Sequence, residues 1–219
     1  MKNIPRIFIE QNIKSGDIIP VTRDVAHYLR HVMRTRCCLV FHDGDEFNAN
    51  LSDDEKNIII GDKTTHSDPS NNITLYVAPI KRMDDLINMV TQLGVARIVP
   101  VITERTVAHH INWSRMKKIA IESAEQSNRN SVPEISDPVP FTELDLRNIA
   151  FADERTAYST KQKPEVLDNI KSVLVGPEGG FSDSEFTALD SSGAVSVSLG
   201  KTILRAELAA VIATEKIIK

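Results

Sequence analysis

From residue 73 to the C-terminus, short apolar segments of strand length alternate with longer segments of helical periodicity, and this alternation is what most limits the fold. Strands are predicted at residues 73–80, 96–103, 149–153, 172–175 and 194–199. Helices are predicted at residues 83–93, 112–127, 164–170, 182–192 and 204–218. Alternation of this kind produces a mostly parallel sheet. The sequence therefore predicts an α/β domain over residues 73–219.

Cap residues set the bounds of these predicted helices. Ser182 and Glu185 form the S-x-x-E pattern of a capping box, in which each side chain satisfies a backbone N–H group of the first turn. Gly94 and Gly193 are typical residues for a helix end, and Asn112 for a helix start. Residues 129–140 contain three prolines and are predicted to be irregular.

The first 70 residues follow a different pattern, with predicted strands at 6–10, 37–41, 47–51 and 57–61. Turn-forming residues separate the last three, which we interpret as hairpins, and a helix capped by Thr22 is predicted to run to Arg34. Residues 68–72 are polar turn formers and mark the predicted boundary. We expect a small β-rich domain over residues 1–70.

The formal net charge is −4, from 26 basic and 30 acidic residues, which argues mildly against nucleic acid as a partner. A local basic segment, residues 21–36, offsets this because it holds Arg23, Arg30, Arg34 and Arg36 with two histidines and one aspartate. On a helix the first three lie near one face. They are candidates for RNA phosphate contacts, and an ordinary solvated charged face is the alternative.

Several classes of protein are disfavoured. Cys37 and Cys38 are adjacent and are expected to be reduced, as small buried side chains. The six histidines show no ligand spacing, so we expect no metal. No run approaches the ~20 apolar residues of a membrane span, and the N-terminal residues do not resemble a secretory signal. A cytoplasmic protein is expected.

Two glycine-rich segments follow predicted strands, at residues 175–182 (VGPEGGFS) and 198–205 (SLGKTILR). Ligands of open α/β sheets bind beyond the carboxyl ends of strands, and glycine lets backbone groups approach them without a Cβ in the way. Neither segment matches G-x-G-x-x-G or the P-loop pattern, which disfavours a dinucleotide or triphosphate site. Two ordinary tight turns are the alternative.

Taken together, these segments resemble the paired signature of the 16S rRNA uridine-N3 methyltransferase family (ribosomal RNA small subunit methyltransferase E), of the knotted SPOUT superfamily. Further motifs agree in order and spacing: Leu93-Gly94-Val95, Thr103-Glu104-Arg105-Thr106, Glu125-Gln126-Ser127-Asn128-Arg129 and the N-terminal His27-Tyr28-Leu29-Arg30-His31-Val32-Met33-Arg34. The chain departs from the family pattern at Met89, usually Lys, at Gln92, usually Glu, and at Ala206 and Leu208, usually Thr. These departures bear on substrate contacts more than on cofactor binding.

This resemblance implies a fold and partners that pattern alone does not. The C-terminal domain is expected to hold a trefoil knot near residues 175–205, and the N-terminal domain to be a PUA-like β-barrel that binds RNA. The cofactor would be S-adenosyl-L-methionine and the substrate a uridine, methylated at N3, of 16S rRNA or the small ribosomal subunit. The family forms homodimers with the last helix at the interface, although that helix equally suits packing on its own sheet.

The site residues implied by the resemblance lie on the two glycine-rich segments. The expected cofactor-binding residues are Leu174, Val175, Gly176, Pro177, Glu178, Gly179, Gly180, Ser198, Leu199, Gly200, Ile203 and Leu204. Arg205 is expected to stabilise negative charge on the uracil or to hold a phosphate, Glu178 to hold a ribose or act as base, and Glu207 to orient Arg205. Arg129 is expected near the substrate.

Two other functions fit parts of the pattern. A non-catalytic RNA-binding protein could use the same two domains, but it would not need the glycines of both loops. A nucleotide-dependent transferase of another α/β type would need a phosphate-binding lysine loop, which the sequence lacks. The methyltransferase is the favoured prediction.

Overall fold

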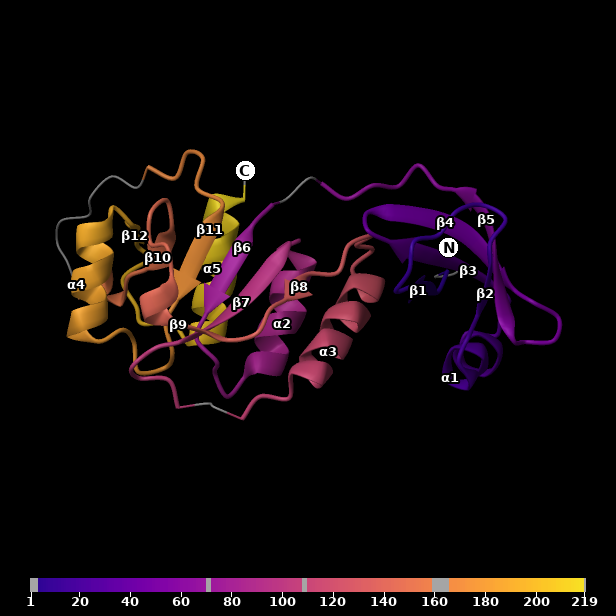
Figure 1. Ribbon diagram of the computed structural model, residues 1–219, viewed down its shortest axis with the longest axis horizontal. Helices are drawn as coiled ribbons and strands as arrows, with labels where there is room; N and C mark the ends of the chain where they lie inside the picture. Colours follow the sequence, from indigo (N-terminus) through magenta and orange to yellow (C-terminus); the bar gives the residue numbers. More distant parts are fainter. Residues whose placement is uncertain (1–3, 70–71, 108–109, 159–165, 219) are drawn as a thin grey trace. The chain divides into compact units, whose positions relative to one another are not determined.

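The computed structural model describes residues 4–69, 72–107, 110–158 and 166–218 (Figure 1). The chain divides into two compact units. The first comprises residues 1–69 and 121–132, and the second comprises residues 70–120 and 133–219. A segment from the middle of the chain therefore completes the N-terminal unit.

The first unit contains a curled five-stranded sheet in the order β1-β3-β4-β5-β2. Its strands are β1 Arg6–Phe8, β2 Ile18–Pro20, β3 Cys37–His42, β4 Asp45–Leu51 and β5 Asn57–Lys63. Strands β3, β4 and β5 form the predicted antiparallel hairpins. The sequence did not predict β2, because three residues ending in a proline give almost no alternation to detect. In the described residues β1 and β2 are sheet edges, so the sheet is a half-barrel and not a closed ring.

The predicted N-terminal helix is present but changes type along its length. Helix α1 covers Arg23–His27, and the π-helical turn η1 continues it over Tyr28–Val32. Thr22 caps it as predicted, with its hydroxyl oxygen accepting the N–H of Val25 at 3.3 Å. Ala26 and Leu29 are buried, and Leu29 belongs to the hydrophobic core beneath the sheet.

The second unit contains a parallel sheet in the order β12-β10-β11-β6-β7-β8, with β9 also paired to β7. The strands are β6 Thr74–Val77, β7 Arg97–Ile102, β8 Glu134–Ile135, β9 Val139–Pro140, β10 Ala150–Ala152, β11 Ser172–Val175 and β12 Val195–Val197. Every strand pairing of this sheet within the described residues is parallel, which confirms the predicted α/β class. Strand β11 lies between β10 and β6, and β12 lies outside β10.

The prediction that residues 129–140 are irregular is wrong in part. β8 and β9 pair with β7, although three prolines lie in this segment. A two-residue strand at the border of a sheet makes few ladder bonds, so a proline there removes little.

Four α-helices and two 3₁₀ turns are described besides α1 and η1. They are α2 Met83–Gln92, α3 Trp113–Gln126, η2 Phe141–Glu143, η3 Glu154–Tyr158, α4 Asp183–Ser192 and α5 Ala206–Ile217. The capping box of α4 forms as predicted, and Gly193 ends the helix with φ 85°. Asn112 accepts the N–H of Arg115 at 3.0 Å, as expected at the start of α3.

One predicted helix is wrong where it can be checked. Residues 164 and 165 lie outside the described residues, and residues 166–170 form a turn and not a helix. Asn169 takes the left-handed conformation, with φ 65°, and this interrupts helical geometry. The turn is closed by a hydrogen bond from the Ile170 N–H to the Leu167 carbonyl at 3.2 Å.

Candidate functional site

The loops after β10, β11 and β12 meet at one edge of the parallel sheet, and they surround a cavity of about 610 Å³. Parallel strands all end at the same edge, which is where ligands of α/β sheets bind. Ten of the twelve residues predicted to bind cofactor line this cavity: Val175, Gly176, Pro177, Glu178, Gly179, Gly180, Leu199, Gly200, Ile203 and Leu204. Leu174 and Ser198 are buried and are not part of its lining.

The loop after β11 depends on its glycines for space. A Cβ on Gly176 would lie 3.3 Å from the Phe181 ring, and a Cβ on Gly180 would overlap Glu154 Oε1. Gly180 also has φ 68°. Arg105 holds the loop from outside by donating to the carbonyl oxygens of Gly179 and Phe181, both at 3.0 Å. The loop is thus packed on both sides with little room for side chains.

In the second loop, the backbone conformation of residue 200 explains why a glycine is present there, whereas lack of space does not. Its φ is 111°, whereas a Cβ there would meet no atom within 4 Å. Next to it, Ile203 is 55% exposed and presents an apolar side chain at the cavity. Glycine is needed because side-chain-bearing residues rarely adopt this backbone.

The two predicted acidic site residues contact the start of α2. Glu178 is exposed, and its carboxylate accepts the backbone N–H of Lys81 at 3.1 Å. Glu207 is buried and forms an ion pair with Arg82, at 3.1 Å. Glu207 was expected to orient Arg205, and its partner is Arg82 instead. The Lys81–Arg82 turn was missed because neither residue stands near a glycine-rich motif.

Arg205 lies at the mouth of the cavity. It is the N-cap residue of α5, and its side chain makes no cap hydrogen bond and is exposed. No ion pair or hydrogen bond engages its guanidinium within the described part of the chain. A cation in this position is available to a ligand.

The cavity also has a third loop that sequence reasoning did not identify. Ala152, Asp153, Glu154, Thr156 and Ala157, at the end of β10 and in η3, line it. The signal was present, since two acidic residues and an arginine directly follow a buried strand at the functional edge of the sheet.

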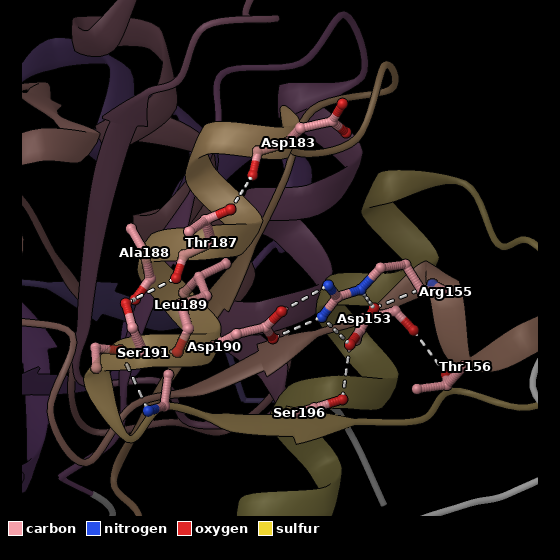
Figure 2. A network of polar contacts seen from close by, with 12 residues as sticks. Asp153, Arg155, Thr156, Asp183, Thr187, Ala188, Leu189, Asp190, Ser191 and Ser196 are labelled. Atoms are coloured by element: carbon pink, nitrogen blue, oxygen red, sulfur yellow. Dashed lines mark hydrogen bonds and ion pairs between the residues drawn. The ribbon is translucent and has the colours of Figure 1, made fainter.

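An ion-pair network fixes this third loop (Figure 2). Arg155 donates from Nε and one terminal nitrogen to Asp153 at 2.9 and 2.8 Å, and to Asp190 of α4 at 2.9 and 2.8 Å. Its guanidinium stacks over the Phe186 ring at 3.9 Å, and the Ser196 hydroxyl donates to Asp153 at 2.8 Å. Hydrogen bonds to Asp190 and Asp153 raise the pKa of Arg155. Both oxygens of the buried Asp153 carboxylate thus accept hydrogen bonds.

The carboxyl group of Glu154, next to Asp153, is not part of this ion-pair network. Its side chain is half-buried, and burial is the main cause that raises the pKa of its carboxyl group. The neighbouring Asp153 raises this pKa further, while its own backbone N–H, Arg155 and Arg105 act in the opposite direction. A carboxyl group of this kind in a cavity is a candidate for proton transfer.

The predicted RNA-binding arginines of the first unit divide into two kinds. Arg30 pairs with Glu55 at 2.9 Å, and Arg36 pairs with Asp53. Arg23 and Arg34 are exposed and have no ion-pair partner among the described residues. Arg34 has φ 54°, so the chain turns sharply there after η1.

Arg129 belongs to a buried polar cluster of the first unit. Its side chain is 12% exposed and lies 3.4 Å from Asp68, measured between Nη2 and Oδ2. Arg6, which is buried, donates to the Arg129 carbonyl at 2.8 Å, to Asn130 Oδ1 at 2.7 Å and to Glu46. Arg129 does not line the cavity, and its contacts are those of a structural residue.

Two features are absent from the part of the chain that the structure describes. No group of three or more His, Cys, Asp or Glu side chains could hold a metal ion there. None of the described helices has the length and apolar character required to cross a membrane.

The chain is similar to known RNA methyltransferases in sequence. Residues 67–218 match the family described as RNA methyltransferase domain. Ribosomal RNA small subunit methyltransferase E of Rickettsia conorii is 33% identical over 230 residues, covering 97% of this chain and 94% of that protein. The protein of the same name from Aquifex aeolicus is 30% identical over 220 residues, covering 94% and 95%.

Solved structures agree with the sequence matches. The crystal structure of a ribosomal RNA small subunit methyltransferase E from Neisseria gonorrhoeae, bound to S-adenosyl methionine, is 26% identical. It superposes with a TM-score of 0.84 and covers 98% of this chain and 97% of that one.

Proposed function

The chain belongs to the ribosomal RNA small subunit methyltransferase E family, and from that membership we propose that it methylates N3 of a uridine in 16S rRNA. S-adenosylmethionine is the methyl donor, as the donor-bound relative indicates. The observation that carries the proposal is that ten of the twelve predicted donor-binding residues and Arg205 line one cavity.

The cavity suits this donor. Its volume of about 610 Å³ lies within the range of small-molecule sites. Gly176 and Gly200 line the cavity without a side chain, so their backbone N–H and C=O groups could bond to an adenine edge and a ribose. Leu199 and Ile203 offer apolar surface beside them. When bound, the donor supplies a methyl group on a positively charged sulfur.

The side chains at the mouth of the cavity act on the RNA base. Uridine N3 carries a proton. When this proton leaves, the negative charge that remains spreads onto the uracil oxygens. Arg205 has a free guanidinium at this place, and a fixed cation stabilises charge that develops during a reaction. The Arg82–Glu207 ion pair holds the start of α2 to α5, and Glu178 holds the Lys81 turn to the donor loop.

The proposed substrate must present an unpaired base. N3 lies on the Watson–Crick edge, which is hidden in a duplex, so a single-stranded or splayed-out uridine is required. Contacts from the first unit would supply affinity through phosphates. Since ribosomal RNA is the substrate, the cytoplasm is the expected compartment.

We also propose a homodimer in which α5 takes part. Leu208 on α5 is 43% exposed, and Ile203 just before the helix is 55% exposed. Equilibrium sedimentation should give twice the monomer mass, and Leu208→Glu should weaken the association. A monomer at all accessible concentrations would contradict this part.

Methyl transfer with mapping of the product tests the function. Purified protein, donor labelled in the methyl group and either naked 16S rRNA or small subunits are incubated, and the modified nucleotide is located by mass spectrometry. We expect one 3-methyluridine. RNA binding without label would favour the non-catalytic alternative, and label on another atom or nucleotide would refute the substrate assignment.

A further inference from the structure

Four carboxylic side chains line the cavity within the described residues: Asp153, Glu154, Glu178 and Glu207. Three of them have partners that stabilise the charged form. Asp153 is bound by Arg155 and Ser196, Glu207 by Arg82, and Glu178 by the backbone N–H of Lys81. Each of these three carboxylates is therefore already engaged in a contact of the fold.

Glu154 differs from these three, since the hydrogen bond to its carboxyl group comes from its own backbone N–H. No ion pair engages its carboxyl group within the described part of the chain, and its side chain is half-buried. Its Oε1 atom occupies the space where a Cβ on Gly180 would stand. The carboxyl group thus lies directly against the donor-binding loop.

The surroundings of Glu154 hold it in place on two sides. On the chain side, Asp153 and Arg155 anchor the end of β10 to α4 through Asp190 (Figure 2). On the other side, Gly180 leaves room for the carboxyl group because it lacks a side chain. A catalytic group needs such preorganisation to stay within reach of its target atom.

Building on the proposed function, we propose that Glu154 is the general base that accepts the proton from uridine N3. The N3–H bond breaks and the proton moves to a Glu154 oxygen. The electron pair left on N3 forms the bond to the methyl carbon, and the carbon–sulfur bond breaks with its pair remaining on sulfur. No further reactant is required.

The electrostatic setting supports this role. Burial is the largest cause that raises the pKa of Glu154, and Asp153 acts in the same direction, while its own backbone N–H, Arg155 and Arg105 lower it. A raised pKa brings a carboxylate closer to neutrality, where it is a better base. Because only the deprotonated form accepts a proton, the methylation rate should fall as pH falls through the pKa of Glu154.

Single-turnover methylation at saturating donor and 16S rRNA, measured across pH, is the first test. Glu154→Gln keeps the shape of the side chain and removes its basicity, so we expect a rate at least about 100-fold lower, the scale of losing one general base. The acid limb of the pH–rate profile should disappear. Glu154→Asp should recover part of the rate, and Glu143→Gln, an exposed change elsewhere in the second unit, should leave the rate unchanged.

Two measurements separate this role from others. The first measurement is the donor affinity of Glu154→Gln, from calorimetry, which should stay within about threefold of the parent. A change of that size would be much smaller than the rate loss expected from removing a general base. The second measurement is NMR of the protein without donor, labelled with ¹³C at the glutamate carboxyl groups. The signal that is missing in Glu154→Gln belongs to Glu154, and its pKa should lie above the ordinary range of glutamate.

The outcomes are distinct. A near-parental rate for Glu154→Gln, a rate loss explained by weaker donor binding, or an ordinary titration of its carboxyl would each overturn the proposal. If the parent protein methylates no uridine N3, the proposed function fails, and the base assignment with it. If the parent methylates and Glu154→Gln does too, only the base assignment fails.

Discussion

At the scale of single residues, the Arg205 side chain is the clearest candidate for a role in the reaction. This residue precedes α5, and its exposed side chain has no partner in the described residues. We predict that Arg205→Ala lowers single-turnover methylation by roughly 100-fold, the scale of losing one preorganised charge-stabilising donor. Arg205→Lys should recover part of the loss, since it keeps charge without the planar, two-pronged geometry.

The control for the Arg205 variants is to show that they fold and bind donor as the parent protein does. Donor affinity, dimerisation and thermal stability should be those of the parent protein, because no contact of the fold is removed. Near-parental turnover in Arg205→Ala would show that another group balances the charge on the base.

Two glycines on the second unit allow a matched comparison. Gly200 and Gly193 have φ 111° and 85°, and a Cβ at either would meet no atom within 4 Å. Alanine at each should therefore cost a similar ~1 kcal/mol in the free energy of unfolding, from backbone strain alone. Only Gly200→Ala should weaken donor binding in calorimetry, since Gly193 merely ends α4. Equal donor affinity in both variants would remove the second loop from the site.

At the scale of elements, α1, η1 and the residues that follow them contain two classes of arginine. Arg30 and Arg36 are engaged by Glu55 and Asp53, whereas Arg23 and Arg34 are free of ion pairs in the described residues. We predict that Arg23→Gln with Arg34→Gln flattens the salt dependence of RNA binding. Two lost phosphate contacts should change the slope of log K against log salt by about 1.4, at ~0.7 per contact for single-stranded RNA.

Arg30→Gln with Arg36→Gln is the matched control for that prediction. It removes the same charge, but Glu55 and Asp53 already neutralise Arg30 and Arg36, so any change in slope should be smaller. Donor affinity should be unaffected by either pair. An unchanged slope in the first pair would take this helix out of the RNA interface.

At the scale of the whole molecule, the first unit is discontinuous in sequence. Residues 121–132 join residues 1–69 through Asn130, which is fully buried. Its Oδ1 atom accepts from Arg6 at 2.7 Å, and its amide donates to the His66 carbonyl at 3.1 Å. Asn130→Ala leaves a buried guanidinium short of an acceptor. We expect a loss of about 3 kcal/mol in the free energy of unfolding, the range for hydrogen bonds to charged groups.

Amide hydrogen exchange shows which unit loses stability in Asn130→Ala. Amides of β1 and β4 should exchange faster in Asn130→Ala, and those of the parallel sheet should not. Asn50→Ala, which changes an exposed side chain of β4, should have little effect on either. Faster exchange confined to the second unit would contradict the assignment of Asn130 to the first.

The sequence by itself determined the local elements and indicated the two glycine-rich loops that line the cavity. Strand–helix alternation indicated the parallel sheet, and Ser182, Glu185 and Gly193 set the bounds of α4, because periodicity and caps act between residues close in the chain. The trefoil knot near residues 175–205 stays a prediction, based on resemblance and compatible with the position of β11 between β10 and β6.

Only the tertiary structure decided which distant residues meet. It brought Glu154 against Gly180, paired Glu207 with Arg82 and not Arg205, and placed Arg129 in a cluster with Asp68. The physical reason is that partners of charged side chains are chosen by space, and loops after parallel strands converge whatever their separation in sequence. A pattern of residues along the chain shows which groups are present, and the fold decides which of them are free to react.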